Sequence, residues 1–173
     1  MMCWAGWLIV AQIATAETPL LCDFEQGTDG WTLDWGLKQN PTNVAGRAKM
    51  GTNSLALVHE FKKKEETVGV HLVFPTETDF TSAGNFEGFS AWVYFPKGNG
   101  WEAQFYYHAG STWEWRAGPL FTDLQPGWHQ LFLRRKDLGK ATAMLDLGIQ
   151  VKNYRLNQPV TVSIDRVEAL YSK

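Results

Sequence analysis

The clearest pattern in the chain is an alternation of apolar and polar side chains across residues 89–108, interrupted by the turn Lys97–Gly100. One parity carries side chains typical of a hydrophobic core: Phe89, Ala91, Val93, Phe95, Ala103, Phe105 and Tyr107. The other parity carries aromatic and polar side chains: Ser90, Trp92, Tyr94, Glu102, Gln104, Tyr106 and His108. Because successive side chains of a strand point to opposite faces, this stretch predicts a hairpin with one core face and one aromatic, polar face.

Shorter alternating segments occur along the rest of the chain, and glycine or proline turns separate them. They are residues 20–25, 54–61, 67–74, 128–133, 144–151 and 160–170. Segments 54–61 and 67–74 flank a charged turn and predict a second hairpin, whereas 32–51 reads as loop. About eight to ten short strands without a useful amphipathic helix predict an all-β fold, a two-sheet antiparallel β-sandwich.

The length of 173 residues fits one globular domain. Residues 1–16 contain no charged side chain and end on Ala14-Thr15-Ala16, a small-x-small pattern. We interpret them as a signal peptide of a secreted protein, extracellular or periplasmic, followed by a single domain over 17–173. The alternative is a buried segment that begins the fold, and a membrane span would need about 20 apolar residues.

Charge and cysteine content narrow the ligand class. Cleavage after residue 16 would remove Cys3 and leave Cys22 without an intramolecular partner. The net charge of −2 gives no basic footprint for nucleic acid or for an anionic membrane. We therefore expect a monomer with a neutral ligand.

The aromatic and amide side chains suggest that this ligand is a sugar. A pyranose has an apolar C–H face and a rim of hydroxyls, so its site needs flat rings and hydrogen-bonding side chains. The candidate ligand-binding residues are Trp31, Trp35, Trp92, Tyr94, Gln104, Tyr106, Trp113, Trp115, Arg116 and Gln150. Glu102 and Asp146 are further polar candidates. For every ring the alternative is an ordinary packing role in the core.

Several short motifs resemble, in their order, the β-jelly-roll (galactose-binding-like) carbohydrate-binding modules attached to secreted glycoside hydrolases, including mannan- and glucan-binding families. They are residues 23–27, 30–31, 54–57, 89–96, 113–115, 127–128, 147–150 and 162–167. The resemblance covers nearly all of 17–173. It implies non-catalytic binding of a neutral polysaccharide of β-mannan or β-glucan type, with a separate glycoside hydrolase as a partner.

The same resemblance implies one structural calcium, held by Glu25, Asn53 and Asp165. Calcium prefers carboxylate and carbonyl oxygens, and an ion here would join both ends of the domain to the sheet. The chain departs from the family at Arg166, where such modules often have a second acid. The alternative is that these side chains are satisfied by hydrogen bonds to the backbone.

Jelly rolls also host enzymes, so two other functions stay open. A polysaccharide lyase would use Tyr106 or His108 to accept a proton, with Gln104 or Arg116 neutralising a uronate. A hydrolase would need two suitably spaced carboxyls, for which Glu102 and Asp146 are candidates. A third alternative is a structural or protein-interaction sandwich. Non-catalytic binding is the interpretation that the sequence favours.

Overall fold

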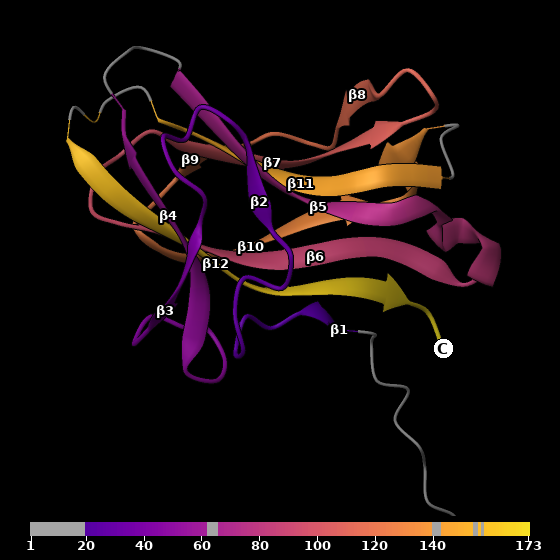
Figure 1. Ribbon diagram of the computed structural model, residues 1–173, viewed down its shortest axis with the longest axis horizontal. Helices are drawn as coiled ribbons and strands as arrows, with labels where there is room; N and C mark the ends of the chain where they lie inside the picture. Colours follow the sequence, from indigo (N-terminus) through magenta and orange to yellow (C-terminus); the bar gives the residue numbers. More distant parts are fainter. Residues whose placement is uncertain (1–19, 62–65, 140–142, 154–155, 157) are drawn as a thin grey trace, which may run out of the picture.

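A computed structural model describes residues 20–61, 66–139, 143–153, 156 and 158–173. Two antiparallel sheets pack face to face, which confirms the predicted β-sandwich (Figure 1). The predicted signal peptide lies outside the described residues. Among the helices of the described part, none has the length and apolar character to cross a membrane.

Each sheet contains six strands in the described part of the chain. Sheet A has the order β10 (Gly127–Arg134), β6 (Phe86–Phe95), β12 (Pro159–Tyr171), β4 (Asn53–Glu60) and β3 (Thr42–Ala45), with β1 (Leu20–Cys22) beside β12. Sheet B has the order β2 (Thr32–Trp35), β5 (Glu66–Asp79), β11 (Ala143–Asn153), β7 (Trp101–Ala109) and β8 (Glu114–Ala117), with β9 (Phe121–Leu124) beside β7. Two 3₁₀ turns, η1 (Phe80–Ala83) and η2 (Arg135–Leu138), follow β5 and β10.

The core lies between the sheets and contains the side chains that the alternation predicts. Phe89, Val93 and Phe95 of β6 have no exposed surface, nor does Phe105 of β7. Trp101, at the start of β7, packs against Phe95 with ring centroids 5.1 Å apart. Period two therefore identified the inward face of both strands correctly, because burial on one face imposes that pattern.

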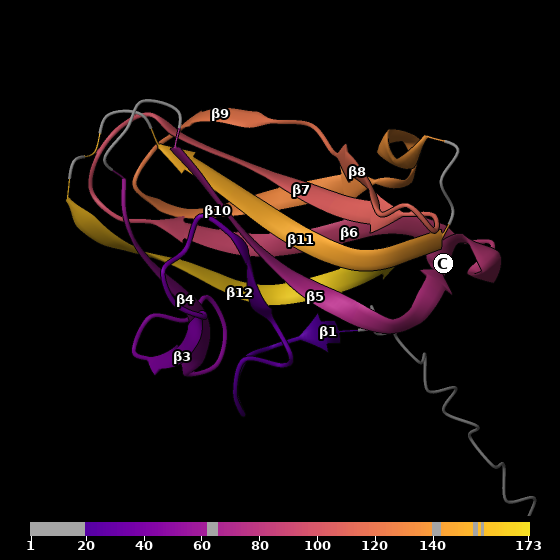
Figure 2. The same ribbon diagram turned by 45° about the horizontal axis from the view of Figure 1, so that its top comes forward.

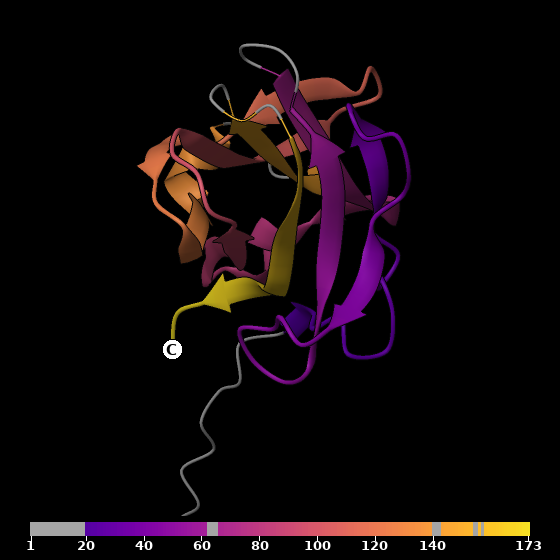
Figure 3. The same ribbon diagram turned by 90° about the vertical axis from the view of Figure 1, so that its left-hand side faces the viewer.

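The predicted hairpins, in contrast, are wrong. Strand β6 pairs with β10 and β12 in sheet A, whereas β7 pairs with β11, β8 and β9 in sheet B. Strands β4 and β5 are likewise in different sheets. Figure 2 shows β6 and β7 in separate layers, and Figure 3, turned by 90°, shows the strands arranged around the interior. The polar faces of β6 and β7 consequently lie on opposite sides of the molecule.

The segment 32–51 differs from its prediction as loop, because it contains β2 and β3. Trp31, a candidate ligand-binding residue with a core role as the alternative, is only 1% exposed. Gly30 adopts a positive φ of 80°, a conformation open to glycine, and the turn directs Trp31 into the core. There its indole packs edge-on against Phe24 and its Nε1 donates a hydrogen bond to Cys22 Sγ at 3.1 Å.

Burial should make Cys22 unreactive. The side chain is 3% exposed, and burial raises the pKa of its thiol to about 12. Because the thiolate is the reactive species, we expect very slow reaction with Ellman's reagent at mildly alkaline pH in a chain that begins at residue 17. The same chain in guanidinium chloride should react completely within minutes. Fast reaction of the native protein would show that the Trp31 contact does not protect the thiol.

Candidate ligand-binding face

The outward surface of sheet B, here called the sheet B face, is built on two glycines that let aromatic rings lie flat on the strands. Tyr106 covers Gly148 of the neighbouring strand, where a Cβ would meet the ring Cζ at 2.1 Å. Trp35 covers Gly69 in the same way, with a Cβ-to-ring distance of 2.8 Å. Any side chain at either glycine would therefore lift a ring off the sheet.

Tyr106 is fixed at its far end as well. Its hydroxyl lies 2.9 Å from Asp34 Oδ2 and 3.2 Å from the carbonyl oxygen of Val70. A tyrosine ring that spans β7, β11 and β5 in this way is fully buried although it lies on an outward face. Burial raises the pKa of its phenol far above the ordinary value, with the negative charge of Asp34 as the next cause, so it stays protonated.

Two indoles pack against this buried tyrosine, and a third lies beside the neighbouring His108. Trp35 lies 4.7 Å from Tyr106 between ring centroids, and Trp115 lies 6.4 Å away with an interplanar angle of 22°. Trp113, in the turn before β8, contacts His108 at 5.5 Å. Trp113 and Trp115 are 48% and 47% exposed, which leaves large flat apolar surfaces open to solvent. These two rings are the accessible platforms, and Tyr106 supports one of them.

Two polar pairs continue the sheet B face along β7 and β11. Gln104 Nε2 donates a hydrogen bond to Gln150 Oε1 at 3.1 Å, and the register places the two residues directly opposite each other. In the next row, Lys152 Nζ lies 3.2 Å from Glu102 Oε2. Each amide keeps donors and acceptors beyond this one bond, so the pair can also contact hydroxyl groups.

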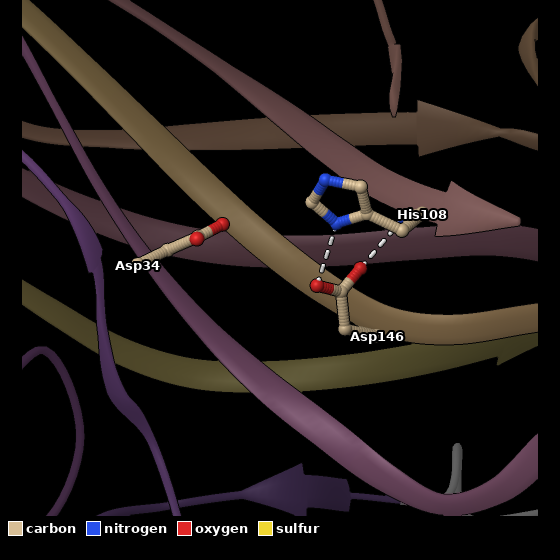
Figure 4. A group of neighbouring side chains, drawn as sticks. All are labelled: Asp34, His108 and Asp146. Carbon is tan, nitrogen blue, oxygen red and sulfur yellow. Dashed lines mark hydrogen bonds and ion pairs between the residues drawn. The ribbon is translucent and has the colours of Figure 1, made fainter. Parts of the chain in front are cut away.

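A histidine and aspartate network lies beside the rings. Asp146 is fully buried, and its Oδ2 lies 2.7 Å from His71 Nδ1 and 2.8 Å from His108 Nδ1. The backbone N–H of His108 donates to Asp146 Oδ1 at 2.6 Å. Since an ionised carboxylate only accepts, both Nδ1 atoms carry protons, and each imidazole keeps Nε2 for another partner. Figure 4 shows that the second ring nitrogen of His108 points away from Asp146.

The network shifts two pKa values. Burial raises the pKa of Asp146, but the hydrogen bonds from His71 and His108 outweigh burial and hold the pKa below its ordinary value. Burial lowers the pKa of His71, but the hydrogen bond to Asp146 and the nearby charge of Asp34 outweigh burial and raise it. A charged carboxylate and a readily charged imidazole are thus stabilised beside the exposed rings.

Three residues of this network form the group in the described part of the chain that could hold a metal ion. Ligand atoms of Asp34, His108 and Asp146 all lie within 4.8 Å of one another. Both oxygens of Asp146 already accept hydrogen bonds, and Asp34 accepts one from Tyr106. A metal would have to replace these bonds, so the contacts fit a hydrogen-bonded network better than a metal site.

The residues expected to bind calcium are close together, but hydrogen-bond donors surround them. Glu25 Oε1 accepts from the N–H groups of Thr52 and Asn53 at 2.9 and 3.0 Å, and Oε2 accepts from the Thr52 hydroxyl at 2.6 Å. Asp165 Oδ2 accepts from the N–H groups of residues 49 and 50 at 2.6 and 2.9 Å. These contacts fit the alternative that the carboxylates are satisfied by hydrogen bonds to the backbone. Backbone N–H groups lie against the carboxylate oxygens, whereas a calcium ion needs oxygen ligands around it. Calcium binding stays a prediction.

The sheet B face brings together part of the predicted set and leaves the rest elsewhere. Its predicted members are Trp35, Gln104, Tyr106, Trp113, Trp115 and Gln150. Trp92 and Tyr94 lie on the outward face of sheet A, where Lys49 Nζ lies 4.0 Å from the ring centroid of Trp92. They were grouped with Tyr106 only because β6 and β7 were expected to pair.

Arg116 and Trp31 also lie away from the sheet B face. Arg116 is opposite Tyr107, a core-facing residue, and its Nη2 binds Glu114 Oε2 at 2.7 Å. Trp31 is in the core. Sequence reasoning missed Asp34 and His71 as members of the face. Because side chains alternate along β5 and Val70 faces the core, its neighbour His71 must face outward, and this alternation was the signal that could have identified it. Asp34 had no such signal, because its segment was predicted as loop.

Comparisons with known proteins agree on the fold. The sequence model of the family described as "Mannanase, galactose-binding domain-like" matches residues 22–165. No curated protein matches the chain.

Three similar solved structures contain carbohydrate-binding modules. A family 28 module specific for non-crystalline cellulose has a TM-score of 0.67 at 15% identity and covers 90% of this chain and 96% of its own. A family 27 module of Caldicellulosiruptor saccharolyticus in complex with mannohexaose has a TM-score of 0.66 at 13% identity, covering 88% and 96%. A Clostridium thermocellum xylanase fragment, a family 22 module joined to a catalytic module, has a TM-score of 0.60 at 15% identity, covering 87% and 28%.

Replacing Asp146 tests the network. We expect Asp146→Asn to lower the pKa of His71 and to destabilise the protein by on the order of 2–4 kcal/mol, since a buried charge with three donors is lost. The contribution of charged His71 to the free energy of unfolding is complete below its unfolded pKa of 6.5. It is lost as the pH rises through the raised pKa of the folded state. The contribution of ionised Asp146 to the free energy of unfolding is complete above its unfolded pKa of 3.8. It is lost as the pH falls through the lowered pKa of the folded state.

The stability difference between wild type and Asp146→Asn should therefore be largest between about pH 4 and 6.5, between the two ordinary pKa values. Urea unfolding across the pH range measures it, and an NMR titration of His71 measures the pKa directly. A difference that does not vary with pH would contradict the network.

Proposed function

This chain belongs to the mannanase galactose-binding domain-like family, and on that basis we propose that its sheet B face binds a neutral polysaccharide of β-mannan or β-glucan type without cleaving it. The observation that carries the proposal is the pair of half-exposed indoles, Trp113 and Trp115, beside the Gln104–Gln150 amide pair. Flat apolar rings suit the C–H faces of pyranoses, and amides suit their hydroxyls.

The extent of the sheet B face favours a chain of sugars over a single sugar. Trp35 covers Gly69 on β5 and Trp115 is on β8, three strands further along the sheet. Their ring centroids lie 4.7 and 6.4 Å from that of Tyr106, whose ring covers Gly148 of β11 between them. A ligand that touches both rings must be longer than one pyranose, so several weak contacts combine on one polymer.

The charges on the sheet B face favour a neutral ligand. Lys152 pairs with Glu102, and the histidines His71 and His108 share the carboxylate of Asp146. No excess of cations faces outward among these described residues, so a polyuronate would find little to neutralise its charge. The mannanase description of the family supports mannan before glucan.

The burial of Asp146 supports binding over hydrolysis. Its carboxylate is near that of Asp34, but Asp146 has no exposed surface. A glycosidase needs both carboxyls in contact with the scissile bond or with an attacking water. The polysaccharide would then be cleaved by a separate glycoside hydrolase, which we propose as the functional partner.

Affinity gel electrophoresis against mannan, β-glucan, xylan and alginate tests the proposal. We expect retardation by mannan or β-glucan and no release of reducing ends. Unsaturated products from alginate would instead indicate a lyase. Unretarded migration in every gel would contradict polysaccharide binding and favour a structural sandwich.

Two matched tryptophan substitutions test which side of the molecule binds. Trp115→Ala should abolish retardation, since it removes an exposed platform, and should change the free energy of unfolding by about 1 kcal/mol or less. Trp92→Ala removes the same side chain from the opposite face of the sandwich and should leave retardation unchanged. Loss of binding in Trp92→Ala alone would place the ligand on sheet A.

A further inference from the structure

A concave region lies on the other layer of the sandwich, at the end of sheet A. It has a volume of about 760 Å³, and its lining residues come from η1, β6, β10, η2 and β12. Sites for small molecules commonly have volumes of roughly 300–1,000 Å³. None of the residues of the sheet B face contributes to it.

The walls of this cavity combine an apolar surface with an excess of positive charge. Phe132, Leu138 and Leu170 provide the apolar part, and Arg134, Arg135 and Lys136 provide three cations. Glu87 is the one acidic residue in the lining. The cavity therefore carries a net positive charge in a chain whose net charge is −2.

The three cations are not neutralised within the described part of the chain. Its ion pairs involve other basic residues. Asp137 is next in sequence, but its Oδ2 accepts a hydrogen bond from the backbone N–H of Arg134 at 3.1 Å, so this carboxylate caps the turn. Arg134 lies over the Phe132 ring at 5.7 Å.

The backbone that carries the cations is anchored. Leu138 is buried in the core, and its carbonyl oxygen accepts a hydrogen bond from Tyr107 at 2.8 Å. On the other side of the cavity, Arg135 Nη1 donates to the carbonyl oxygen of Gly84 at 3.1 Å, which ties η2 to the turn before β6. The backbone of η2 is thus fixed, so a ligand would have to order only the exposed side chains that project from it.

We propose that this cavity binds the carboxylate of an acidic sugar, such as a uronate unit of a polysaccharide or oligosaccharide. The guanidinium and ammonium groups suit a carboxylate, and the apolar wall with Phe132 suits the C–H face of the ring. A neutral glycan would leave three cations unused, and a nucleic acid would need a longer basic surface. The protein would then hold a neutral polymer on sheet B and an acidic unit on sheet A.

Calorimetric titration with trigalacturonate tests this assignment, with neutral mannotriose and a glutamate-rich hexapeptide as comparison ligands. We expect wild type to bind trigalacturonate, more weakly at high salt because charge attraction is screened. The double variant Arg135→Ala/Lys136→Ala should bind at least about tenfold more weakly. The matched double variant Lys97→Ala/Lys38→Ala removes the same charge at exposed positions outside the cavity and should bind as wild type does.

Trp115→Ala separates this cavity from the sheet B face. We expect it to lose retention on neutral polysaccharide and to keep trigalacturonate affinity. No trigalacturonate binding at low salt, equal loss in both double variants, or loss in Trp115→Ala would overturn the proposal. Binding of the acidic peptide alone would also overturn it, in favour of a protein ligand. Retention on neutral polysaccharide is measured separately, so either proposal can fail without the other.

Discussion

The placement of Tyr106 flat against the sheet determines what the sheet B face can present. A glycine on β11 gives the ring its place, and the hydroxyl is fixed by Val70 on β5, two strands from β7, and by Asp34 on β2, three strands from β7. Because the ring is a rigid, buried layer on the outside of the sheet, both Trp35, which lies flat over Gly69, and Trp115 pack against it. An outward sheet surface that would ordinarily be covered by flexible polar side chains thus becomes a firm aromatic one.

The histidine and aspartate network gives this aromatic surface a polar neighbour of comparable rigidity. Asp146 has its hydrogen-bonding capacity occupied from two strands, β5 and β7, so both imidazoles have fixed orientations. Fixed rings and fixed ring nitrogens reduce the ordering cost of binding, which matters for a ligand whose individual sugar contacts are weak. The amide pair of Gln104 and Gln150 extends the same principle along the strands.

Alternation in the sequence predicted the inward face of each strand but not its neighbours. Phe89 and Phe105 were both correctly placed in the core, yet their strands belong to different sheets, because period two reports burial and contains no information on pairing. The candidate site was consequently a mixture of two faces. Trp92 and Tyr94 share the parity of Tyr106, but they lie across the core from it. Trp31 and Asp34 were misjudged for a related reason, since β2 has only four residues between the turns at Gly30 and Gly36 and is too short to show a periodic signal.

The two outward faces of the sandwich have different chemistry, and the account depends on that separation. The sheet B face offers exposed indoles and balanced charge, whereas the end of sheet A offers a cavity with an excess of cations. The most direct measurement is an NMR titration that follows the indole N–H signals of all tryptophans as mannohexaose is added. We expect the signals of Trp113, Trp115 and Trp35 to shift and those of Trp31, Trp92 and Trp128 to stay unchanged. Shifts confined to Trp92 and Trp128 would contradict this expectation.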